Sequence, residues 1–213
     1  MRILKLIILA VVGLITACSK PEKLPYLQME VVAKEVDGKI VEDTTFRTIP
    51  DFKLYNQDSA LVTLKDFENS IYVADFFFTS CPTICPTMHR NLFKVYKKFQ
   101  NNPAVKYASH TIDVKYDKPS VLKAYAKKMG IKGNNWQFLW GTRDEIYALA
   151  ERNYMVYTSE DNKAPGGFAH QGYLILVDKQ KRIRGAYDGT DKKQVEMLGK
   201  DMDILLAEYK TLD

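Results

Sequence analysis

One run of apolar residues limits the possible folds of this chain more than any other feature. Residues 71–78 read IYVADFFF and are almost continuously apolar and aromatic. A strand of this kind is typical of a sheet that is covered on both faces, whereas a strand with one face in water alternates between apolar and polar residues. We therefore expect a central buried strand, and the chain passes from it directly into Thr79, Ser80 and Cys81.

Helices and strands are predicted to alternate after this strand. The helices are expected over residues 86–101, 120–129, 144–153 and 192–209, and the further strands over residues 105–114, 136–140, 171–178 and 182–187. Ser120 and Thr142 are candidate N-terminal caps. The order β-α-β-α-β-α-β-β-α predicts an α/β, thioredoxin-like fold with a central mixed sheet flanked by helices. Residues 50–54 and 61–64, on either side of a polar turn, predict an N-terminal β-hairpin extension.

The first residues are typical of an export signal. Arg2 and Lys5 precede or interrupt a short apolar segment, residues 3–15, which is shorter than the ~20 residues that span a bilayer. The sequence ITAC at residues 15–18 resembles the bacterial lipoprotein box, in which Cys18 receives the lipid. A transmembrane helix and a plain secretory signal are the alternatives.

These features divide the chain into three parts. We expect a lipoprotein signal peptide at residues 1–17, a lipid anchor and tether at residues 18–45, and one folded domain at residues 46–213. The domain is then tethered to a membrane of the cell envelope and lies outside the cytoplasm, on the periplasmic side.

The charge of the chain excludes one class of partner. The chain has 31 basic and 26 acidic residues, a net charge of +5, without a basic run or interleaved aromatic residues. Nucleic acid is therefore not an expected partner.

The chain has three cysteines, and Cys18 is the one expected to carry the lipid. The other two are Cys81 and Cys85 in the sequence CPTICP, where three residues separate the thiols. At a helix N-terminus both thiols favour the thiolate form, which promotes metal binding and thiol-disulfide exchange alike. The spacing also permits a disulfide between Cys81 and Cys85, so it does not choose between these uses.

Three segments together give the chain a family resemblance. FFFTSCPTICP at residues 76–86, DVKYDKP at residues 113–119 and FAHQ at residues 168–171 resemble the Sco/SenC copper proteins. The resemblance implies that Cys81, Cys85 and His170 are metal ligands. It also implies that the copper is destined for the binuclear copper centre of cytochrome c oxidase, so that the copper-centre subunit of that enzyme is a partner. Other periplasmic copper carriers or thiol reductants are further possible partners.

The donor set agrees with copper. Two thiolates and one imidazole suit Cu(I) and, with an added oxygen or solvent ligand, Cu(II), whereas structural zinc takes a fourth protein ligand. His89 competes as a ligand because it follows Cys85 by one helical turn, and His110 is expected to be a surface or core-edge residue. Asp113 and Asp117 are either supporting groups beside the ligands or ordinary turn residues.

Three functions follow from these residues. A copper metallochaperone is the first, and a thiol-disulfide oxidoreductase that reduces the cysteines of the copper acceptor, with Cys81 or Cys85 as nucleophile, is the second. A peroxiredoxin-like peroxidase is the third, although the chain lacks the proline and threonine placement that such sites use before the cysteine.

Overall fold

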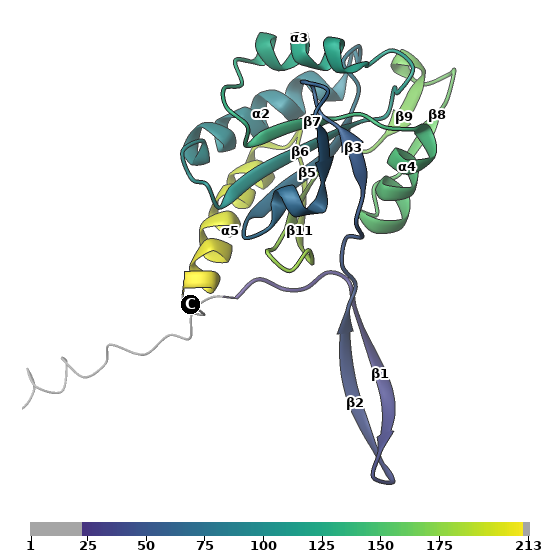
Figure 1. The fold of residues 1–213 in the computed structure, drawn as a ribbon, viewed down its shortest axis with the longest axis vertical. Helices are drawn as coiled ribbons and strands as arrows, with labels where there is room; N and C mark the ends of the chain where they lie inside the picture. The colour runs from purple at the N-terminus through teal and green to yellow at the C-terminus, as the bar shows by residue number, and fades with distance from the viewer. Residues whose placement is uncertain (1–22, 211–213) are drawn as a thin grey trace, which may run out of the picture.

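The protein is built around a five-stranded mixed sheet (Figure 1). The computed structural model describes residues 23–210, so the predicted signal peptide and Cys18 lie outside the described residues. The strand order is β11-β10-β5-β6-β7, in which β5, β6 and β7 are parallel and β10 and β11 are antiparallel to their neighbours. The strands are β5 (Ile71–Phe77), β6 (Val105–Thr111), β7 (Trp136–Leu139), β10 (Tyr173–Val177) and β11 (Ile183–Asp188). The predicted α/β fold and element order are confirmed.

Helices cover both faces of this sheet. The helices are α2 (Ile84–Phe99), α3 (Pro119–Met129), α4 (Arg143–Ala148), which continues as the π-helical turn η2 (Leu149–Asn153), and α5 (Lys192–Lys210). Right-handed crossovers in one direction place α2 and α3 on the same face. Successive side chains of β5 point to opposite layers: the ring of Phe77 lies 4.7 Å from that of His89 in α2, whereas Phe76 lies 5.5 Å from Tyr154, which follows η2. The central strand is therefore buried on both faces, as its composition predicts.

The helix boundaries differ from the sequence prediction at two places. Helix α2 begins at Ile84 rather than at Pro86, because a proline in the first turn loses no hydrogen bond there. Helix α3 begins at Pro119, and Lys118 rather than Ser120 occupies its N-cap position. The cap predicted at Thr142 is confirmed, since its hydroxyl accepts a hydrogen bond from the Glu145 amide at 3.3 Å.

Two β-hairpins precede the core. The predicted hairpin is confirmed as β3 (Lys53–Tyr55) and β4 (Leu61–Thr63), which pair antiparallel and lead into the short helix η1 (Leu64–Phe67). A second hairpin, β1 (Met29–Val36) and β2 (Lys39–Phe46), lies in the segment predicted as a tether.

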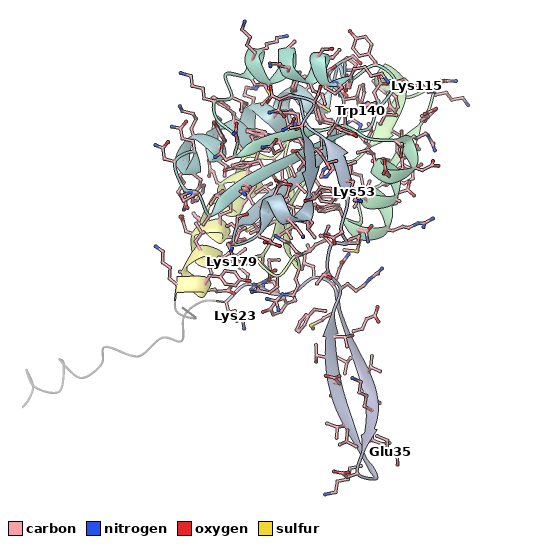
Figure 2. The ribbon with its side chains drawn as sticks, viewed as in Figure 1. Lys23, Glu35, Lys53, Lys115, Trp140 and Lys179 are labelled. Carbon is pink, nitrogen blue, oxygen red and sulfur yellow. The ribbon has the colours of Figure 1, made fainter. Side chains whose placement is uncertain are left out.

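This second hairpin projects from the body of the protein, with Glu35 near its tip (Figures 1 and 2). Its turn is Asp37-Gly38, and both residues have positive φ, at 53° and 71°, as a two-residue type I′ turn requires. Residues 29–45 of the expected tether are therefore structured, and the Asp37-Gly38 pair is the sequence signal for this hairpin.

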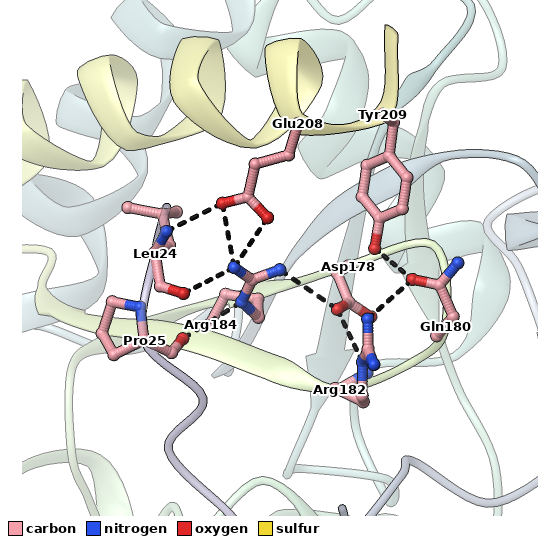
Figure 3. Close-up of polar contacts among 8 residues, drawn as sticks. All are labelled: Leu24, Pro25, Asp178, Gln180, Arg182, Arg184, Glu208 and Tyr209. Atoms are coloured by element: carbon pink, nitrogen blue, oxygen red, sulfur yellow. Dashed lines mark hydrogen bonds and ion pairs between the residues drawn. The ribbon is translucent and has the colours of Figure 1, made fainter. Parts of the chain in front are cut away.

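A buried arginine fastens the N-terminal segment to the end of α5 (Figure 3). The Arg184 guanidinium donates to the carbonyl oxygens of Leu24 and Pro25, at 2.6 and 3.0 Å, and to both carboxylate oxygens of Glu208 at 2.9 Å. It also lies 3.4 Å from Asp178. Five donors in a rigid fork suit an arginine to such a junction.

None of the helices in residues 23–210 has the length and apolar content of a membrane span.

Candidate metal centre

Three sulfur and nitrogen donors meet at the end of β5 from which α2 departs. Cys81 lies in the loop after β5, Cys85 lies in the first turn of α2, and His170 ends β9 (Phe168–His170), a short strand paired with β8 (Thr158–Glu160). The Cys85 Sγ lies 3.2 Å from the His170 Nε2, and the donor atoms of all three residues lie within 4.8 Å of one another. The structure thus brings together Cys81, Cys85 and His170, although Cys85 and His170 are 85 positions apart in the sequence.

Asp117 holds the loop that carries Cys81. Its side chain is fully buried and accepts a hydrogen bond from the Thr79 amide at 2.9 Å, one from the Thr79 hydroxyl, and one from the Thr111 hydroxyl at 2.6 Å. Burial raises the pKa of Asp117, and the two threonines offset part of that effect. Asp117 therefore connects the segment before Cys81 to the end of β6. Of the two roles considered from the sequence, these contacts favour that of a supporting group over that of a turn residue.

Phe78 and Gly166 position His170. The Phe78 ring contacts the rings of Phe168 and His170, at centroid distances of 5.0 and 5.3 Å. Gly166 has a φ of +80°, and a Cβ atom added there would lie 2.7 Å from the Phe78 ring. Glycine is thus required for the segment that carries His170 to pack onto Phe78.

The two thiols have unequal acidity. The hydrogen bond with Cys85 lowers the pKa of Cys81 far below the ordinary thiol value and outweighs the opposing effect of burial, and His170 lowers it further. The same hydrogen bond and burial raise the pKa of Cys85. Cys81 is therefore the thiolate of the pair, and Cys85 is the donor that stabilises it. Both cysteines are free thiols in this structure, and a disulfide between them remains a prediction.

The geometry fits a copper ion. Metal bonds of about 2.0 Å to imidazole nitrogen and 2.3 Å to thiolate sulfur give donor separations of up to about 4.6 Å. The observed limit of 4.8 Å is close to that range, so small side-chain shifts suffice for coordination. Two sulfur donors and one nitrogen donor form the soft set that copper prefers. Among residues 23–210 no fourth His, Cys, Asp or Glu joins this cluster.

His89 is not a ligand in this arrangement. Its Nε2 lies 3.0 Å from the Asp75 carboxylate, and its Nδ1 lies 2.8 Å from the Tyr125 hydroxyl, so both ring nitrogens already have partners. Asp75 also accepts a hydrogen bond from Ser109 at 2.6 Å. Asp75 is a site residue that the sequence prediction lacks, although a carboxylate inside an apolar strand is a signal for a buried polar role.

His110 and Asp113 also lie outside the donor cluster. His110 is fully buried, which corrects the expected surface or core-edge position, and its Nδ1 donates to the Asp75 carbonyl oxygen at 3.2 Å. Burial lowers the pKa of His110 to about 4. Asp113 accepts a hydrogen bond from the Tyr116 amide at 3.1 Å and from the Asp117 amide at 2.9 Å, which is turn geometry.

The chain is similar to one known family of proteins. The SCO1/SenC family model matches residues 41–202. A SCO1 protein homolog from Bacillus subtilis is 30% identical over 159 residues, which are 72% of this chain and 80% of the relative.

Two solved structures share the fold. The crystal structure of a SCO1/SenC family lipoprotein from Bacillus anthracis has a TM-score of 0.69 and 28% identity, and covers 75% of this chain and 95% of that one. BsSco, described as having a disulfide switch and as a member of the Sco family of cytochrome c oxidase assembly proteins, has a TM-score of 0.66 and 27% identity, and covers 75% of this chain and 94% of that one. The family model covers well over half of the chain, and this chain belongs to the SCO1/SenC family.

Proposed function

We propose that this protein binds one copper ion through Cys81, Cys85 and His170 and delivers it to the binuclear copper centre of cytochrome c oxidase during assembly. One observation carries the proposal: two thiols and an imidazole from distant parts of the chain converge within 4.8 Å. Family membership supports the same function. Copper here is cargo, so the site must release the ion as well as hold it.

Each ligand has a distinct part in this function. The Cys81 thiolate, already favoured in the copper-free protein, provides the first anionic donor. Cys85 loses its proton when the metal replaces the hydrogen bond between the two sulfurs. His170 completes the set from a separate β-ribbon, so that a shift of this ribbon opens one side of the site without unfolding the helix that carries Cys85.

Copper(I) titration of the reduced protein without oxygen tests this assignment. We expect one copper ion per chain, and a loss of affinity of at least tenfold in Cys81→Ser, Cys85→Ser and His170→Ala. His89→Gln is the matched control, because it changes a buried histidine of the same region that has no place in the donor cluster. Unchanged affinity in His170→Ala, or a loss in His89→Gln as large as in His170→Ala, would refute the ligand set.

A second function uses the same two sulfurs. The Cys81 thiolate can attack a disulfide of the copper acceptor, and Cys85 can then resolve the mixed disulfide, leaving the acceptor with two thiols and this protein with a disulfide. The low pKa of Cys81 beside a partner thiol supports this role. The variant His170→Ala distinguishes the two functions, because it should weaken copper binding while the rate of disulfide exchange stays within about twofold of that of the unchanged protein.

We also propose that a lipid on Cys18 holds the domain at a membrane of the cell envelope, on the side away from the cytoplasm. The lipoprotein box supports this location, and so does the likeness to a SCO1/SenC lipoprotein. Metabolic labelling with a palmitate analogue should mark the protein but not Cys18→Ala. Equal labelling of both would exclude lipidation at Cys18.

A further inference from the structure

The basic residues that the sequence spreads along the chain gather on two neighbouring helices. Helices α2 and α3 contain no aspartate or glutamate, and their seven cations are Arg90, Lys94, Lys97, Lys98, Lys123, Lys127 and Lys128. The whole chain has a net charge of +5, so everything outside these two helices has a net charge of −2. Such an asymmetry gives one face of the protein a positive potential that attracts anionic partners.

Most of these cations have no carboxylate partner within the described residues, although Arg90 donates a hydrogen bond to the Thr87 hydroxyl and Lys97 donates one to the Gln100 side chain. Lys98 pairs with Asp203, and Lys123 pairs with Asp58. Among residues 23–210, no ion pair involves the other five, and all five side chains are exposed. Surface charges that serve only solubility are usually interspersed with charges of the opposite sign, which is not the case on these two helices.

A cavity of about 450 Å³ opens between α2 and α3, beside the two cysteines. Its wall includes both Cys81 and Cys85, together with the apolar side chains of Phe93 and Met129. Arg90 and Lys128, one from each helix, also line it. His170 is not among the lining residues, so the cavity lies against the two cysteines on a side that the imidazole does not occupy.

We propose that this basic cavity between α2 and α3 is the docking site for an acidic segment of the protein partner that exchanges copper or electrons with Cys81 and Cys85. The proposal rests on the proposed function and identifies the chemistry of the partner: a thiol-bearing segment with an apolar or aromatic side chain and flanking carboxylates. The apolar walls accept the side chain, and the cations of the two helices steer the carboxylates.

The position of the N-terminal segment favours a protein over a membrane surface as the occupant. Cys81 follows the end of β5, whereas Val177 and the adjoining Arg184 junction lie at the start of β5, where Val177 pairs with Tyr72. The segment at Lys23 and the projecting hairpin lie at this second end of the molecule, and α3 lies at the opposite end (Figures 1 and 2). An anchor attached before Lys23 therefore leaves the basic face turned towards the surrounding compartment.

Copper transfer to two peptides tests the proposal with the full-length protein. Each peptide has two cysteines and one phenylalanine, flanked by four glutamates in one peptide and by four lysines in the other. Copper(I) passes by ligand exchange without a change of oxidation state. The two peptide thiols lose their protons as they bind the metal: one proton returns to the released Cys85 and the other passes to the buffer, because Cys81 stays a thiolate. The copper left on the protein after rapid size-exclusion separation gives the initial rate. We expect the acidic peptide to react about tenfold faster at low salt, and the preference to disappear in high salt.

The variant Arg90→Glu/Lys128→Glu should abolish or reverse this preference. The matched control is Lys53→Glu/Lys65→Glu, which makes the same change of net charge at two exposed lysines on β3 and η1. We expect the control to keep the preference within about twofold. Equal loss in both double variants would show that net charge alone matters and would overturn the assignment of the surface.

A copper-free measurement separates failure of this proposal from failure of the copper function. A protein thiolate attacks an aromatic disulfide, the reagent's S–S bond breaks, a mixed disulfide forms and one aromatic thiolate leaves and is measured by absorbance. The anionic dithiobis(nitrobenzoate) should react about tenfold more slowly, relative to the neutral dithiodipyridine, in Arg90→Glu/Lys128→Glu than in the unchanged protein.

An unchanged ratio of the two reagent rates would overturn the docking proposal whether or not copper binds. If the ratio of the two reagent rates changes as expected but the protein does not bind copper, only the proposed function is refuted. Suppression of copper transfer by phosphatidylglycerol vesicles but not by phosphatidylcholine vesicles, with no preference between the two peptides, would assign the surface to lipid headgroups and overturn the proposal.

Discussion

The packing of Gly166 on Phe78 allows the position of His170 to be tested without altering a ligand. Gly166→Ala places a Cβ atom 2.7 and 2.9 Å from two atoms of the Phe78 ring and 3.2 Å from Pro82, at a φ of +80°. Because Phe78 contacts His170, relief of this clash must move the ring or the segment that carries the imidazole. The expected result is a displaced third ligand.

The neighbouring Gly167 is a matched control. It has a φ of +86°, and a Cβ atom added there meets nothing within 4 Å. Both alanines therefore incur the left-handed strain of about 1–2 kcal/mol, whereas only Gly166→Ala adds an overpacking cost of about 1–3 kcal/mol. The difference between the two variants isolates the contact with Phe78.

The assay combines urea unfolding of the copper-free protein with competition for copper(I) against a chelator. We expect Gly166→Ala to lower the free energy of unfolding by about 1–3 kcal/mol more than Gly167→Ala does. We also expect copper affinity to fall about tenfold or more in Gly166→Ala, which corresponds to about 1.4 kcal/mol, and to stay within about twofold in Gly167→Ala. Equal copper affinity in the two variants would refute the idea that this packing positions His170.

Three further perturbations test other parts of the structure. Asp117→Asn replaces a carboxylate oxygen that accepts hydrogen bonds with an amide group that donates them, so the free energy of unfolding in urea should fall by about 1–3 kcal/mol and copper affinity should fall as well. The control Asp113→Asn should change the free energy of unfolding by less than about 0.5 kcal/mol. Equal effects of the two substitutions would contradict the role of Asp117. Burial lowers the pKa of His110 to about 4 in the folded protein, below its ordinary value of 6.5. The contribution of the neutral imidazole to the free energy of unfolding is therefore fully present above pH 6.5 and is lost as the pH falls, by up to about 3 kcal/mol near pH 4. Urea unfolding at several pH values should show that the free energy of unfolding falls less steeply between pH 6.5 and 5 in His110→Phe than in the unchanged protein. Identical slopes of the free energy against pH in the two proteins would contradict this prediction. Arg184→Met removes the cation between Asp178 and Glu208, while Arg182 still pairs with Asp178, so the free energy of unfolding should fall by about 3 kcal/mol, the lower end of the cost of breaking a buried ion pair. The Leu24 amide should lose hydrogen-exchange protection while copper affinity is retained, and a protected Leu24 amide would show that the junction does not depend on the arginine.

The core of the fold could be predicted because its signals are local. The apolar run over β5 and the helical spacing of α2 and α5 identify their elements from short stretches of chain. The projecting hairpin was missed although its Asp37-Gly38 turn is an equally local signal. The start of α2 at Ile84 differs from the predicted start at Pro86, because a proline is tolerated throughout the first turn and does not mark the first residue of a helix.

The site could be predicted only in part. The resemblance selected His170, and its proximity to Cys85 depends on pairing between β8 and β9 that no local pattern reveals. The sequence named Asp117 as either a supporting group or a turn residue, and only the packing of its side chain against Thr79 and Thr111 decides between them. The basic face depends on the packing of α2 beside α3, which no local pattern reveals. The burial of His110 belongs to the same class, because a histidine near a strand end is consistent with either surface or core.

X-ray absorption at the copper edge of the loaded protein measures the central claim directly. We expect scattering from two sulfurs at about 2.3 Å and from one imidazole nitrogen at about 2.0 Å, with the imidazole contribution absent in His170→Ala and retained in His89→Gln. A copper environment without imidazole in the unchanged protein, or one that is the same in His170→Ala, would contradict the account.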